Sequence, residues 1–193
     1  LAVVTTLSLA TGCAKLMDIK QMDENSDVSG LMSVGQDIVE DVNLDKPSKD
    51  RAGNAITVPD NVDKIVSMAP STTQVLIELG LGDKIVGIDT NSVTYIDKLP
   101  SGVAQFDMMA PDNEAIAALK PDIVFTSGMS SVGGTSPFQS LPSLFLCVAD
   151  IPSPDSIEGI CDDIKFIGTC VGKGMEGLAY AKGLTVFMEG VEE

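Results

Sequence analysis

Histidine and tryptophan are absent from this 193-residue chain, and arginine occurs once, at Arg51. Without histidine, Ser-His-Asp triads, histidine general bases and most zinc sites are excluded. The formal net charge is -16, from 28 acidic and 12 basic residues. This balance argues against a nucleic-acid surface, which needs clustered lysine and arginine. The length is enough for one domain with a core and a tail.

Cysteine occurs four times, but no Cys-x-x-Cys pair is present. Cys161 and Cys170 fall in one helical segment, and their spacing puts them on opposite sides of that helix. Cys147 lies in an apolar, strand-like run. We therefore expect buried, reduced thiols rather than a disulfide framework.

The amino-terminal stretch "LAVVTTLSLATGCAK" is apolar and rich in small residues, and it turns polar after Cys13. It is too short for a membrane span and has the character of an export signal over residues 1–13. The first residue is Leu rather than Met, so we expect the beginning of this signal to be missing. Ala10, Thr11 and Gly12 before Cys13 resemble a bacterial lipobox. We expect Cys13 to be lipidated, which would anchor the protein to the outer face of the cytoplasmic membrane. The alternative is an ordinary signal peptide with a chance cysteine.

Residues 14–49 are polar and acidic with scattered apolar residues, as in a flexible tether. From residue 50 the pattern changes to alternating strands and helices. A short hairpin is predicted at 50–60, with its turn at Gly53 and Asn54. Apolar runs predict strands at 63–69, 83–89, 102–106, 121–128 and 142–150.

Helices are predicted between these strands, at 70–82, 111–119 and 153–172, and 91–100 is predicted as a loop or short helix. The last helix has an apolar stripe of Ile157, Ile160, Ile164, Ile167 and Val171. Near-continuous apolar strands joined by helices predict an α/β fold with a doubly wound, mainly parallel sheet.

Ligands of such sheets bind outside the carboxyl ends of the strands. Four strand ends, at 69–72, 89–91, 106–109 and 126–129, are mostly polar and contain no nucleophile–base pair, which favours a binding wall over an active site. Ser71 and Thr72 have an alternative role as N-caps of the following helix. Tyr95 either ligates iron or, the interpretation we favour, covers the cleft. The residues expected to line the cleft are Ser71, Thr72, Asn91, Tyr95, Phe106, Met108 and Met129.

Two glycine-rich stretches need an interpretation of their own. "GTCVGKG", residues 168–174, lacks the spacing and the Ser or Thr of a phosphate loop, so nucleotide binding is not expected. "GMSSVGG", residues 128–134, is a loop that is either mobile or in contact with ligand.

The order of motifs from residue 50 to residue 173 resembles one family. These motifs are Val58-Pro59, "KIVSMAPS", Leu79-Gly80, "GDKIVGID" and a Pro-x-x-Glu helix that leads to Lys120-Pro121-Asp122. Together they resemble the periplasmic substrate-binding proteins of ABC importers for metal chelates, which take up ferric siderophores, haem or cobalamin. The resemblance implies a non-catalytic protein without a cofactor or a metal site of its own, and an ABC permease in the membrane as its partner.

The family has two lobes joined by one long helix, with ligand between the lobes. The resemblance implies that residues 50–171 form the N-terminal lobe, that 172–193 begin the inter-lobe helix, and that the second lobe is absent. Glu114 matches the glutamate by which the family's N-terminal lobe meets arginines of the permease. An acidic residue in the first turn of a helix is also favoured by the helix dipole alone, and both roles are compatible.

The shortage of basic side chains bears on the charge of the expected ligand. Because Arg51 is expected in the hairpin, away from the strand ends, a corrinoid or hydroxamate siderophore is favoured over an anionic catecholate. Two alternatives remain open. One is a surface scaffold or adhesion lipoprotein, and the other is a flavodoxin-like enzyme, although "APSTT" lacks the glycines of a phosphate loop.

Overall fold

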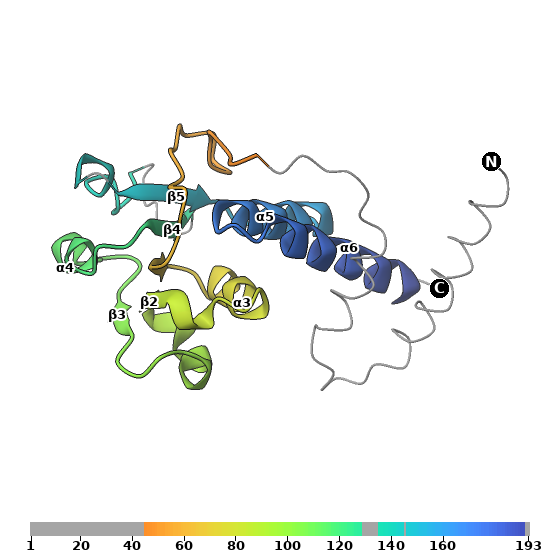
Figure 1. The fold of residues 1–193 in the computed structure, drawn as a ribbon, viewed down its shortest axis with the longest axis horizontal. Helices are drawn as coiled ribbons and strands as arrows, with labels where there is room; N and C mark the ends of the chain where they lie inside the picture. The colour runs from red at the N-terminus through yellow and green to blue at the C-terminus, as the bar shows by residue number, and fades with distance from the viewer. Residues whose placement is uncertain (1–44, 129–134, 145, 192–193) are drawn as a thin grey trace, which may run out of the picture.

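The computed structural model describes residues 45–128, 135–144 and 146–191 (Figure 1). Five strands form one parallel sheet, and its strand order is β3-β2-β1-β4-β5. The strands are β1 (Ile65–Ser67), β2 (Ile85–Asp89), β3 (Ala104–Phe106), β4 (Ile123–Ser127) and β5 (Cys147–Ile151). The chain builds the sheet outward from β1 to β3, crosses over, and adds β4 and β5 on the other side. The predicted doubly wound α/β fold is confirmed.

The sheet is buried on both faces, as its apolar strands predict. The helices α3 (Pro70–Glu78) and α5 (Ile157–Cys170) pack on one face, where the core includes Ile65, Leu76 and Ile167. The short helix α4 (Asn113–Ala118) and the segment around Phe138 cover the other face, where the core includes Val66 and Ile116. All of these core side chains are almost inaccessible to solvent.

Most of the predicted elements are longer than the observed ones, and two of the differences have a clear local cause. The helix expected from residue 111 begins at Asn113, because the Asp112 side chain accepts a hydrogen bond from the Ala115 amide and so caps it. The strand expected from residue 142 begins at Cys147. Pro142–Leu144 form a 3₁₀ turn, η4, since Pro142 has no amide hydrogen for a sheet ladder and the Leu144 amide donates to the Leu141 carbonyl.

Between strands, two further 3₁₀ segments are found: η1 (Gly82–Lys84) and η2 (Thr90–Lys98). The helical alternative for residues 91–100 is therefore confirmed. The hairpin before β1 is reduced to one antiparallel bridge between Lys49 and Ala55, with Gly53 in the left-handed region at φ 89°. Glycine adopts this conformation without a steric cost.

Helices α5 and α6 (Gly174–Val191) form a tightly packed pair. A Cβ atom on Gly168 would lie 2.7 Å from the Lys173 carbonyl oxygen and 3.0 Å from the Gly177 Cα atom. Only glycine therefore permits this close approach of the two helices. The predicted apolar stripe of α5 is wrong at Ile160, which is 42% exposed, because Cys161 occupies the buried side instead.

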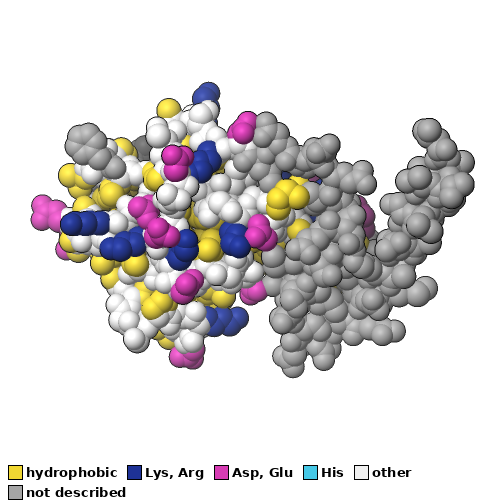
Figure 2. All heavy atoms as spheres, in the orientation of Figure 1, with side chains coloured by type: hydrophobic (Ala, Val, Ile, Leu, Met, Phe, Trp, Pro, Cys, Tyr) yellow, Lys and Arg dark blue, Asp and Glu magenta, His cyan; other side chains and the backbone are white. Residues whose placement is uncertain are grey.

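The thiols of Cys147, Cys161 and Cys170 are free, and Cys161 and Cys170 lie in different apolar clusters, as their spacing predicts. Across the described residues, no helix combines the length and the apolar character that a bilayer crossing needs. Acidic and basic side chains alternate on the face that Figure 2 shows rather than gathering into a basic patch. Cys13, the predicted lipidation site, lies outside the described residues, as do residues 14–44 of the expected tether.

Candidate functional site

A pocket of about 300 Å³ opens at the carboxyl edge of the sheet, and the end of every strand contributes to its wall. This is the edge at which doubly wound sheets bind their ligands, and it includes the crossover between β1 and β4. The lining residues are Ala69, Pro70, Ser71, Thr72, Asn91, Met108, Ser127, Ile151, Pro152, Ser153, Pro154 and Asp163.

Four of the residues expected in the cleft are brought together here: Ser71, Thr72, Asn91 and Met108. The Asn91 side-chain nitrogen donates to the Met108 sulfur at 3.4 Å, which joins the loops after β2 and β3. Their contact with a ligand stays a prediction, but the geometry places polar and soft apolar groups on one wall.

Two other candidates are not part of this lining. Phe106 is buried in the core, and its ring packs against Gly87 of the neighbouring strand so closely that a Cβ atom on that glycine would lie 2.9 Å away. Tyr95 is half-buried on η2 and donates a hydrogen bond to Gln74 at 3.2 Å. Met129 lies outside the described residues.

Ser71 and Thr72 are not helix caps, so this alternative for them is wrong. The N-cap of α3 is Ala69, whose side chain cannot accept a hydrogen bond, and Pro70 is the first helical residue. Thr72 is only 2% exposed, yet it makes no side-chain hydrogen bond with any described residue. Its hydroxyl is therefore available to a group inside the pocket.

Behind the pocket, a chain of buried hydroxyls fixes the first two strand ends. Thr73 donates to Ser67 at 2.8 Å and lies 3.1 Å from the Ser92 hydroxyl. Ser92 in turn donates to the Asp89 carboxylate, which also accepts from the Asn91 amide at 2.8 Å. Ser67, Thr73, Asp89 and Ser92 are fully buried. They satisfy one another and hold α3 and η2 in register at the pocket edge.

The contribution of β5 and α5 to the pocket wall was not expected from the sequence. Ile151 ends β5, residues 152–154 follow it, and Asp163 belongs to α5. A signal for Asp163 is present in the sequence. It precedes the buried Ile167 by four residues, so it is a carboxylate on the apolar face of its helix.

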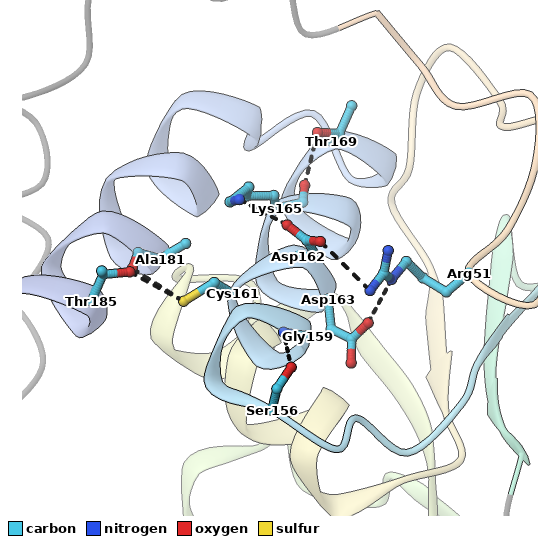
Figure 3. A network of polar contacts seen from close by, with 10 residues as sticks. All are labelled: Arg51, Ser156, Gly159, Cys161, Asp162, Asp163, Lys165, Thr169, Ala181 and Thr185. Atoms are coloured by element: carbon cyan, nitrogen blue, oxygen red, sulfur yellow. Dashed lines mark hydrogen bonds and ion pairs between the residues drawn. The ribbon is translucent and has the colours of Figure 1, made fainter. Parts of the chain in front are cut away.

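Arg51 pairs with this carboxylate, contrary to the expectation that it lies away from the strand ends. Its Nε atom donates to Asp163 Oδ1 at 2.7 Å, and its Nη2 atom lies 4.0 Å from Asp162 Oδ2 (Figure 3). The turn that carries Arg51 is fixed by Asp50, which accepts hydrogen bonds from the Asn54 and Asp150 amides at 2.7 and 3.0 Å. Asp50 thereby fastens this turn beside the end of the sheet.

Asp163 is the one charged residue among the described lining residues of the pocket, and it is paired with Arg51. Burial raises the pKa of the Asp163 carboxyl above its ordinary value, although Arg51 opposes this shift. None of the described lining residues is a lysine or arginine. The described residues also hold no cluster of three or more cysteine, aspartate or glutamate side chains that would bind a metal ion.

Glu114 lies apart from the pocket lining, in the first turn of α4, and its side chain is exposed. Asp112 supplies the cap of this helix, so the Glu114 carboxylate is not used as a cap. It makes no side-chain hydrogen bond or ion pair with any described residue, which leaves it accessible to a partner.

The chain belongs to the periplasmic binding protein family, whose model matches residues 65–193. A curated relative, the ABC transporter substrate-binding lipoprotein YvrC of Bacillus subtilis, is 26% identical over 147 residues, which cover 75% of this chain and 45% of YvrC. The chain thus spans about half the length of the curated relative it matches.

Solved structures show the same fold. A possible iron-binding periplasmic solute-binding protein of Staphylococcus epidermidis superimposes with a TM-score of 0.56 at 27% identity, over 61% of this chain and 45% of that one. The haem-binding protein HmuT gives a TM-score of 0.55 at 25% identity, over 75% of this chain and 46% of that one.

Proposed function

We propose that this protein is the substrate-binding component of an ABC importer, and that it binds a metal chelate and delivers it to a membrane permease. The observation that carries this proposal is the pocket to which all five strand ends contribute, in a chain of this family. The names of the relatives support it, because they describe a transporter lipoprotein, an iron-binding protein and a haem-binding protein.

The pocket supports binding rather than catalysis. Hydroxyl groups of Ser71, Thr72 and Ser153 and the Asn91 amide offer hydrogen bonds, while Met108 and Ile151 offer apolar contact. Such a mixed wall suits an organic shell around a metal. Two further parts of the proposal are lipid anchoring through Cys13 and docking of the permease on Glu114. They rest on the lipobox-like and Pro-x-x-Glu motifs.

Equilibrium dialysis tests the proposal. The full product of the gene would be dialysed against corrinoids, haem and ferric siderophores, and bound chelate read from its visible absorbance. Saturable binding of one class would support a receptor for import and identify its cargo. Absence of binding to every class would overturn the proposal and favour a scaffold role. Retention of a flavin or nucleotide on purification would favour the enzyme alternative.

A further inference from the structure

The pocket wall combines hydrogen-bond donors on one side with a carboxylate on another. The donors belong to the first turn of α3, where no side chain caps the amide groups and Ser71 and Thr72 line the pocket. The carboxylate is Asp163 of α5, the one ionisable group among the described lining residues.

The Asp163 carboxylate is only partly satisfied by Arg51. The guanidinium contacts Oδ1 through its Nε atom alone, since its Nη2 atom is turned toward Asp162. This is not the two-bond pairing that arginine commonly makes with a carboxylate. Figure 3 shows the second oxygen of Asp163 pointing away from Arg51, and this oxygen has no hydrogen bond to any described residue.

The burial of Asp163 strengthens the interactions that this second oxygen can make with a ligand. Asp163 is 9% exposed as a residue, so water solvates it poorly. An acceptor in such a position interacts strongly with any donor or cation placed against it, and it strongly disfavours an anion. The amino end of α3 offsets part of the negative potential, but it carries no formal charge.

We propose that Asp163 determines the charge of the chelate that this pocket accepts, with Arg51 as the residue that positions and partly neutralises it. The pocket then takes a neutral or cationic chelate whose metal-binding oxygens face the amino end of α3 and whose N–H, O–H or ammonium group contacts Asp163. Polyanionic chelates are excluded. This inference rests on the proposed function and narrows its substrate class.

A matched set of ligands tests the inference on the full product of the gene. The probes are a linear ferric trihydroxamate with a terminal ammonium group, its neutral N-acetyl derivative and its anionic N-succinyl derivative, with haem as an independent anion. Equilibrium dialysis with absorbance detection gives the four dissociation constants. For the wild type we expect the cationic chelate to bind at least about tenfold more tightly than the anionic one.

Two variants change this ratio in opposite directions. Asp163→Asn should bring the ratio of the two constants toward one, while affinity for the neutral chelate changes by less than about threefold. Arg51→Gln should widen the ratio, because the carboxylate loses its neutralising partner. A merely structural role would instead weaken all of the chelates equally. Asp162→Asn is the matched control, since Asp162 also contacts Arg51 but does not line the pocket, and it should leave the ratio unchanged.

The outcomes separate the two proposals. If the wild type binds chelates but prefers the anionic derivative or haem, or if Asp163→Asn keeps the wild-type ratio, the role of Asp163 is overturned while chelate binding stands. If Asp163→Asn fails to fold, as circular dichroism would report, the Arg51→Gln ratio decides, and a ratio that does not widen overturns the inference. If the wild type binds none of the probes and no other chelate, the proposed function itself fails.

Discussion

The hydroxyl oxygens of Thr73 and Ser92 lie 3.1 Å apart, and their contact joins the first turns of α3 and η2 directly behind the pocket. The preceding residue, Thr72, has its side chain in the pocket wall instead. Two adjacent threonines thus have different surroundings: Thr73 is hydrogen-bonded to Ser67 behind the pocket edge, and Thr72 lines the pocket.

Thr73→Val should destabilise the fold. The substitution keeps the shape of the side chain but leaves the buried hydroxyls of Ser67 and Ser92 short of a partner. The expected loss in the free energy of unfolding is about 1–3 kcal/mol, measured by urea denaturation. Thr94→Val, on the exposed side of η2, is the matched control and should stay within about 0.5 kcal/mol of the wild type. Equal losses in both variants would show that the buried hydroxyl of Thr73 contributes no more to stability than the exposed hydroxyl of Thr94.

Thr72→Val should leave stability nearly unchanged and weaken binding of the chelate. Its hydroxyl makes no hydrogen bond within the described protein, so only the ligand loses a partner. One lost hydrogen bond corresponds to about 0.5–1.5 kcal/mol, or roughly a two- to tenfold rise in the dissociation constant. Dialysis against the preferred chelate measures it. An unaltered dissociation constant would place the ligand away from the amino end of α3.

Glu114→Gln should abolish or strongly reduce uptake in cells while binding of the chelate stays intact. The carboxylate is exposed and apart from the pocket lining, and loss of its interaction with the α4 dipole should cost no more than about 0.3–1 kcal/mol in stability. Glu158→Gln is a closely matched control, because Glu158 is also exposed and follows its N-cap, Ser156, by two residues in α5. Uptake that persists in the Glu114 variant would remove the docking role.

The raised pKa of Asp163 predicts the sign of a pH effect on stability. A carboxyl whose pKa is higher in the folded state contributes stability below its unfolded value of 3.8, and this contribution is lost as pH rises through the folded value. The melting temperature of the wild type minus that of Asp163→Asn should therefore fall as pH is raised from below 3.8 toward neutrality. A difference that grows with pH would mean that the ion pair with Arg51 outweighs burial.

Gly168→Ala should disrupt the contact between α5 and α6. The added methyl group would lie 2.7 Å from the Lys173 carbonyl oxygen, so the helices must separate or lose a turn. Overpacking of this kind costs about 1–3 kcal/mol in the free energy of unfolding. Lys182→Ala, on the exposed side of α6, serves as the control and should have little effect. A neutral result for Gly168→Ala would show that the helix pair accommodates the methyl group.

The parallel sheet was predictable from sequence because its strands are short apolar runs between helix signals, which is typical of strands buried on both faces. The wrong strand prediction at residues 142–144 also comes from an apolar run. "PSLFLCVAD" reads as one apolar run, but Pro142 and the hydrogen bond from the Ser143 hydroxyl to the Ser140 carbonyl favour a turn before the strand. Local hydrogen bonding there overrides the apolar pattern.

The candidate site was predictable where it depends on strand ends and not where it depends on distant partners. Ser71, Thr72, Asn91 and Met108 follow strands directly, so topology alone brings them together. Phe106 also lies at a strand end, but Gly87 beside it has no side chain, so the Phe106 ring packs into the core. The pairing of Arg51 with Asp163 spans 112 residues, and no local pattern reports such a contact.

Paramagnetic broadening in the NMR spectrum tests the central claim most directly, namely that a metal chelate binds at the carboxyl edge of the sheet. The full product of the gene would be titrated with its preferred ferric chelate, and with the diamagnetic gallium chelate as control. We expect the ferric form alone to broaden the amide signals of Ser71, Asn91 and Ser153, while those of Asp63 and Lys120, which flank the amino ends of β1 and β4, stay sharp. Broadening at Asp63 and Lys120, or at neither edge, would contradict the account.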